Sequence, residues 1–159
     1  MALFNFSASL RPAVATLMTM VCAVVVSAPA EGGLYIADAG FSFQVAAERA
    51  MAQNPGGRRF FLLSLPPESA ALSAGAGPVP TVLRQRVAAA NGVLLVCRRD
   101  LDNGRIAAAD LAPGVVAVRG WTSKGDADLP QGQRFFPGED PASLPASNEA
   151  LRRLRSACS

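Results

Sequence analysis

The chain has 159 residues, half of them hydrophobic, and a formal net charge of +3. This charge is too small to indicate a nucleic-acid-binding protein. The absence of histidine removes the most common general base and the most common metal ligand, so we expect no metal site. Neither a G-x-G-x-x-G motif nor a P-loop occurs, and we therefore expect no cofactor.

The first thirty residues have the features of a secretory signal peptide. Residues 1–12 carry one charge, and residues 13–27 form an apolar run that is short for a membrane span. The small residues 28–30 suit a signal peptidase, which would leave Glu31 as the first residue. An uncleaved membrane anchor is the alternative. Cleavage predicts a periplasmic or secreted protein with no stable membrane span.

Residues 31–121 alternate between apolar strands and amphipathic helices. The first unit is a strand in residues 34–40, a helix in residues 43–53 with Ser42 as N-cap, and a strand in residues 58–65. Strand, helix and strand with short connections form a βαβ unit, which has parallel strands and a right-handed crossover. The sequence therefore predicts an α/β domain.

The second half of this domain continues the alternation. Asn91 and Gly92 end a helix in the manner of a left-handed C-cap, and a strand of four apolar residues then leads to Cys97. The whole domain predicts a small, mostly parallel sheet of about four to five strands. The expected elements are a short helix at 67–72, an exposed loop at 73–80, a helix from Thr81, a turn at 102–104, a short helix at 107–111 and a strand at 115–118.

Residues 122–159 differ in composition from the domain before them. The segment 122–145 is polar and rich in proline and glycine, which predicts irregular structure. Ser147 is a suitable N-cap for a C-terminal helix. Arg152, Arg153 and Arg155 near the end of that helix predict a solvated face. The chain thus divides into residues 1–30, 31–121 and 122–159.

Cys97 is the candidate reactive residue. It ends a predicted strand, at the edge of a parallel sheet where ligands and reactive groups gather. Arg98, Arg99 and Arg105 follow it, and a nearby positive charge favours the thiolate, which is the nucleophilic form. A buried, inert thiol is the alternative, because free cysteine is among the most buried residue types. Asp38, after the first strand, is a further binding candidate or a carboxylate that hydrogen-bonds its own turn.

Cys97 and Cys158 are the only cysteines that remain after signal cleavage. Two such thiols can pair in an oxidising compartment. A bridge between them would close a loop of about sixty residues and contribute roughly 4 kcal/mol on the loop-entropy estimate. It would also leave no free nucleophile. A reactive thiol, an inert thiol and a disulfide are therefore three open alternatives.

A series of residues downstream of Cys97 matches a known pattern. The strand ending in Cys97 is followed by Arg105-Ile106, then Asp110-Leu111, then Pro113-Gly114-Val115 and another strand. In this register residues 34–120 resemble the DsrE/DsrF-like family of sulfur-relay proteins. The resemblance implies a flavodoxin-like, three-layer α/β fold that forms homo-oligomers. It also implies that Cys97 accepts sulfur as a persulfide and passes it to a thiol of a partner protein.

Two functions of different classes follow from the sequence. The first is an exported DsrE-like protein that carries out sulfur transfer or thiol redox chemistry through Cys97. The alternative is a non-catalytic exported interaction module in which Cys97 is structural or bonded to Cys158. A third, weaker option is a small anionic ligand bound beside Arg98 or Arg99.

Overall fold

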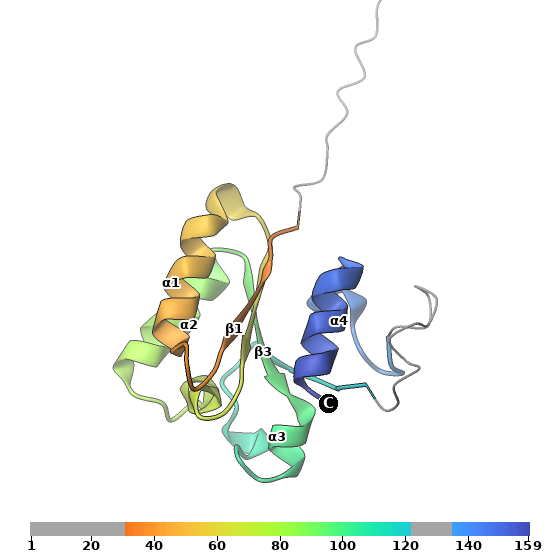
Figure 1. The fold of residues 1–159 in the computed structure, drawn as a ribbon. Helices are drawn as coiled ribbons and strands as arrows, with labels where there is room; N and C mark the ends of the chain where they lie inside the picture. The colour runs from red at the N-terminus through yellow and green to blue at the C-terminus, as the bar shows by residue number, and fades with distance from the viewer. Residues whose placement is uncertain (1–30, 122–134) are drawn as a thin grey trace, which may run out of the picture.

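The computed structural model describes residues 31–121 and 135–159, so the predicted signal peptide and most of the Pro/Gly-rich segment lie outside the described residues. The domain is an α/β structure with a four-stranded sheet in the order β1-β2-β3-β4 (Figure 1). Every neighbouring pair of strands is parallel, which confirms the prediction of a small parallel sheet. The strands are β1 (Leu34–Ala37), β2 (Phe60–Ser64), β3 (Gly92–Cys97) and β4 (Val115–Val118).

Helices connect the strands and follow the last one. The helices are α1 (Phe43–Gln53), α2 (Pro78–Ala89), α3 (Arg98–Asp102) and α4 (Asn148–Ala157). Short 3-10 turns lie at Pro55–Gly57, Glu68–Leu72, Ala108–Asp110 and Pro141–Ser143. None of the helices in the described part of the chain is long and apolar enough to cross a membrane.

The strand order explains how the two faces of the sheet are covered. Each new strand is added on the same side of the preceding one, and right-handed crossovers then place their helices on one face. Helices α1 and α2 accordingly cover one face, while α4 lies against the other (Figure 1). Because side chains alternate along a strand, Leu62 and Val96 pack under α1 and α2, whereas Leu63 and Cys97 pack under α4. The second face is therefore closed by a helix from beyond residue 121.

Local signals account for several element boundaries. The Ser42 hydroxyl accepts a hydrogen bond from the Val45 N–H and starts α1, as predicted. Asn91 has a φ of 64° and ends the segment after α2 in the left-handed conformation, also as predicted.

The first two strands are shorter than predicted, and two helices differ from the prediction. Helix α2 begins at Pro78 and not at Thr81, because proline suits the first helical position, where its missing N–H would have no helical partner. Helix α3, directly after Cys97, was not expected.

Candidate functional site

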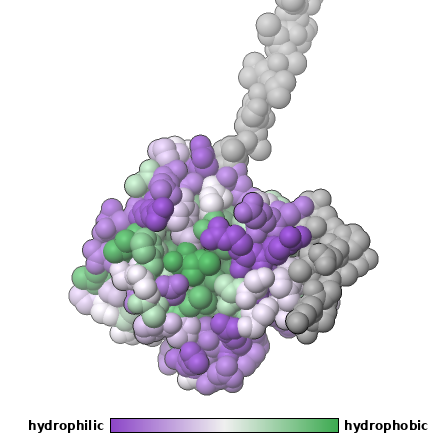
Figure 2. Space-filling model, viewed as in Figure 1, coloured by the Kyte–Doolittle hydropathy of each residue, from purple (hydrophilic) through white to green (hydrophobic). Residues whose placement is uncertain are grey.

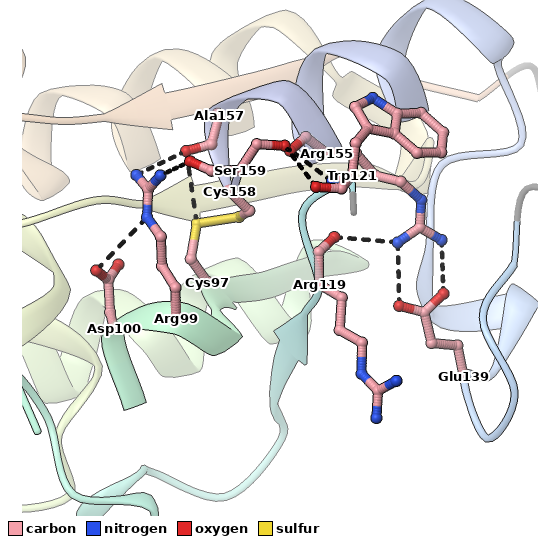
Figure 3. The surroundings of a disulfide bond; sticks show 10 residues. All are labelled: Cys97, Arg99, Asp100, Arg119, Trp121, Glu139, Arg155, Ala157, Cys158 and Ser159. Carbon is pink, nitrogen blue, oxygen red and sulfur yellow. Dashed lines mark hydrogen bonds and ion pairs between the residues drawn. A yellow bond between two sulfur atoms is a disulfide. The ribbon is translucent and has the colours of Figure 1, made fainter. Parts of the chain in front are cut away.

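Cys97 and Cys158 form a disulfide, with 5.1 Å between their Cα atoms (Figure 3). Cys97 is the last residue of β3, and Cys158 is the C-cap of α4. The exposed fraction is 0% for Cys97 and 3% for Cys158. The bridge therefore joins the carboxyl end of a central strand to the end of the helix that covers it. Of the three alternatives left open by the sequence, the structure shows the disulfide.

Arg99 binds the end of α4 and not the sulfur atoms. Its Nη2 donates a hydrogen bond of 2.9 Å to the carbonyl oxygen of Ala157, and its Nη1 donates to the main-chain oxygen of Ser159 (Figure 3). The last carbonyls of a helix have no helical partner and carry a partial negative charge, so a guanidinium stabilises them. The Cys97 Sγ lies 3.9 Å from the same Ala157 oxygen, a contact without a shared proton because the sulfur is in a disulfide.

The other predicted binding residues are not gathered around Cys97. Arg98 is exposed and forms an ion pair of 3.3 Å with Asp102, one helical turn later. Arg105 is also exposed, and its side chain forms no hydrogen bond or ion pair with the residues that the structure describes. Asp38 accepts a hydrogen bond from the Gly40 N–H, which is the turn role considered as its alternative. Since β2 lies between β1 and β3, Asp38 and Cys97 belong to separate strand ends.

Asp100 is a buried acid beside the bridge. Its exposed fraction is 2%, and its Oδ1 lies 3.9 Å from Nε of Arg99. Its Oδ2 is buried and has no hydrogen-bond partner among the described residues. The carbonyl oxygen of Asp100 accepts the N–H of Arg105, which closes the turn after α3. The carboxylate thus faces the guanidinium that holds the end of α4.

Arg155 is the main residue that the sequence placed wrongly. It was expected on a solvated helix face, but its exposed fraction is 0%. Its guanidinium forms a two-pronged pair with Glu139, with distances of 3.1 Å from Nη1 to Oε1 and 2.5 Å from Nη2 to Oε2 (Figure 3). Nη1 also donates to the carbonyl oxygen of Arg119 at 3.1 Å. The rings of two aromatic residues pack against the guanidinium.

These aromatic rings complete a second anchor for α4. The centroid of Phe136 lies 4.5 Å from the Arg155 guanidinium carbon, and that of Trp121 lies 5.3 Å from it. The N–H of Phe136 donates to Glu139, so the carboxylate is itself held in place. A buried arginine needs such partners, because the cost of removing an unpaired charge from water is high. Periodicity could not reveal this pair, because Glu139 comes from an irregular segment.

Gly120 lies where the segment after β4 passes the end of α4. A Cβ atom at this position would lie 2.3 Å from the carbonyl oxygen of Cys158, closer than any real contact. Next to it, the N–H of Trp121 donates to the Ser159 hydroxyl at 2.8 Å. The close approach of two main chains requires glycine here. The disulfide, Arg99, Arg155 and Gly120 therefore all act on one junction between the sheet and α4.

The chemistry available at this junction is that of a buried disulfide. Among the residues that the structure describes, no group of three or more acids and cysteines could hold a metal ion. Arg98 and Arg99 are both engaged with protein atoms, so the geometry does not favour an anionic ligand beside them. No model of a known protein family, no curated protein and no solved structure matches this chain.

Proposed function

We propose that this protein is a non-catalytic interaction module whose disulfide fastens α4 onto the sheet. The observation that carries the proposal is that Cys97 and Cys158 are bonded to each other and almost completely buried. A sulfur carrier requires a thiolate that a donor can reach. In this arrangement Cys97 is neither a thiol nor accessible.

The surroundings of the bridge support a structural role. Arg99 binds main-chain oxygens at the end of α4, and Arg155 binds Glu139 beneath the same helix. Both arginines therefore hold α4 in place. The bridge spans 61 residues of sequence, which corresponds to a stabilisation of about 4 kcal/mol on the loop-entropy estimate.

A disulfide of this kind also supports the proposed location. Disulfides persist in the periplasm and outside the cell, and they are rare in a reducing cytosol. Residues 1–30 have the features of a signal peptide, so both observations favour a periplasmic or secreted protein. N-terminal sequencing of the exported protein tests this, with Glu31 as the expected first residue.

The test of the proposed function is a measurement of the bond and of sulfur uptake on one sample. Non-reducing peptide mapping by mass spectrometry should find Cys97 and Cys158 in one linked fragment. Incubation of the protein with a low-molecular-weight persulfide should add no sulfur (about 32 Da) to Cys97. Uptake of one sulfur by the untreated protein would contradict the proposal.

Two matched variants test separately whether the burial of Cys97 or its bond to Cys158 prevents sulfur uptake. Cys158→Ser leaves Cys97 as a free thiol, whereas Cys97→Ser removes the candidate acceptor altogether. If α4 stays docked, we expect neither variant to take up sulfur, because Cys97 is covered. Uptake by Cys158→Ser alone, while hydrogen exchange shows α4 as protected as in the unmodified protein, would favour sulfur transfer, because loosening of α4 could not then explain access to Cys97.

Sulfur transfer of the DsrE-like type is the second candidate, and one observation favours it. Cys97 lies at the carboxyl end of a central parallel strand, where the resemblance requires its cysteine. The three layers of helix, sheet and helix also support a flavodoxin-like fold, although the strand order lacks the reversal of doubly wound sheets. The formation of homo-oligomers belongs to this second candidate.

This second function needs a thiol reductant before its first step. Two electrons from the reductant would open the disulfide, and the Cys97 thiolate would then attack the outer sulfur of a donor persulfide. The donor would leave as a thiolate, and a thiolate of the partner would later take the sulfur from Cys97. The end of α4 would have to move away during these steps, because it covers Cys97.

A further inference from the structure

The open edge of β1 lies at the bottom of a groove between α1 and α4. No strand among the described residues pairs with this edge, since β1 is the first strand in the sheet order. A cavity of about 380 Å³ follows the edge and is lined by Tyr35, Ile36, Phe41, Arg49 and Arg153, among others. Figure 2 shows hydrophobic surface over β1, with hydrophilic surface of α1 on one side and of α4 on the other.

The backbone of β1 offers hydrogen-bonding groups to this groove. The carbonyl oxygens of Gly33 and Ala37 accept hydrogen bonds from β2 and from the residue after it, at 3.2 and 2.8 Å. In a parallel ladder, alternate residues bond to opposite sides of the strand. Leu34 and Ile36 therefore direct their N–H and C=O groups away from β2. Such an edge is a template for an added strand.

The charges beside the groove select the kind of strand that fits. Arg49 comes from α1 and Arg153 from α4, so one guanidinium lies on each side of the edge. Neither arginine forms an ion pair with any residue in the described ranges, and Arg49 contacts the Phe41 ring at 5.9 Å. Glu31, near one end of the edge, is engaged with two main-chain N–H groups before α4.

We propose that the open edge of β1 binds an extended acidic segment of a partner protein by strand addition, between Arg49 and Arg153. The inference rests on the proposed function as an interaction module and names its partner class. Side chains of an added strand alternate between the α1 side and the α4 side. The segment therefore carries one acidic residue at an odd position and one at an even position, so that one acid faces Arg49 and the other faces Arg153. Pairing of β1 with β1 of a second copy is disfavoured, because it would bring four arginines to one edge.

A short synthetic peptide tests the inference on the full chain with its disulfide intact. The probe is a labelled, end-blocked Thr-Glu-Val-Val-Glu-Thr, whose two acids have opposite parity, and the readout is fluorescence anisotropy. One control peptide carries lysine in place of glutamate. A second is N-methylated on the N–H groups of one edge, which blocks hydrogen bonding and keeps the charge. We expect the N-methylated and lysine peptides to bind at least about tenfold more weakly.

Variants of the protein locate the site. Arg49→Glu combined with Arg153→Glu should weaken binding by about tenfold or more, whereas Arg152→Glu, on the same helix but outside the groove, should leave it unchanged. Ile36→Pro removes an outward N–H from the edge and should abolish binding while the circular dichroism spectrum persists.

Four results would overturn the inference. The first is that the glutamate peptide does not bind, and the second is that its N-methylated form binds equally well. The third is that Arg152→Glu weakens binding as much as the variant with Arg49→Glu and Arg153→Glu. The fourth is that the protein forms a dimer that Ile36→Pro dissociates, because the edge of β1 would then bind a second copy. If these tests fail but the linked Cys97–Cys158 fragment is found and no sulfur is taken up, the proposed function stands and only the assignment of this groove is wrong. Sulfur uptake on the same sample would instead remove the proposed function.

Discussion

Removal of the disulfide tests most directly the role assigned to Cys97 and Cys158. The perturbation is the double variant Cys97→Ala with Cys158→Ala, which replaces both sulfur atoms in the buried cluster under α4. The bridge joins residues 61 positions apart in the sequence, so its loss should lower the free energy of unfolding by about 4 kcal/mol. This is a large share of the roughly 5–15 kcal/mol that stabilises a typical domain.

The same variant should loosen α4 before it unfolds the sheet. Leu151 and Leu154 stay buried against the sheet, and burial of each such side chain contributes about 1.5–3 kcal/mol. Together with the buried pair at Arg155, these contacts keep α4 docked most of the time. Amide hydrogens of α4 should therefore exchange faster in the variant, whereas those of β2 and β3 exchange only on global unfolding.

The assay is urea denaturation followed by circular dichroism, with hydrogen exchange as a second readout. Wild-type protein treated with a thiol reductant should match the variant, because both lack the same cross-link. A loss of stability below about 1 kcal/mol, with unchanged exchange in α4, would refute the reasoning that this bridge closes the fold.

The remaining predictions concern the junction and the segment before it. Glu139→Ala leaves the Arg155 guanidinium buried without that carboxylate, so the free energy of unfolding in urea should fall by about 3–5 kcal/mol, and less when Arg155→Met is added. Gly120→Ala brings a Cβ atom against the main chain of Cys158, and the midpoint of thermal unfolding should fall, whereas Gly77→Ala meets no atom and should have a much smaller effect. Hydrogen bonds from the Ala142 N–H and the Ser143 hydroxyl hold the pKa of Asp140 below its usual value. The contribution of Asp140 to the free energy of unfolding is thus present above the pKa of an unfolded aspartate and is lost as the pH falls through the lowered pKa. Denaturation measured at a series of pH values should show that Asp140→Asn removes this pH dependence.

The order of the helices and strands could be predicted from the sequence, because most of these elements are set by residues close together in the chain. The cap at Ser42, the left-handed Asn91 and the apolar runs of the strands act within a few residues, and all appear in the structure. Predictions failed where the local signal was ambiguous. Thr81 is a good cap residue, yet α2 begins at Pro78 because proline also suits a first helical turn.

The candidate site was predictable only in part. The position of Cys97 at the end of a strand follows from the apolar run before it, and the pairing with Cys158 was one of the alternatives that the composition allowed. Burial could not be predicted for Arg155, because its partner Glu139 lies in a segment without periodicity. The direction of Arg99 could not be predicted either, since it depends on where α4 ends.

The sequence by itself determined the parallel α/β sheet, the strand that ends at Cys97 and the helix that begins after Ser147. These features follow from hydrophobic periodicity and capping, which are properties of neighbouring residues. The tertiary structure decided which face α4 covers and what Cys97 becomes. Crossovers of one hand leave the second face of this sheet open, and burying that face brings Cys158 to the end of β3 and Arg155 to the main chain after β4. Cys97 at the end of its strand therefore forms a buried disulfide, because the helix that covers it ends at the second cysteine, Cys158.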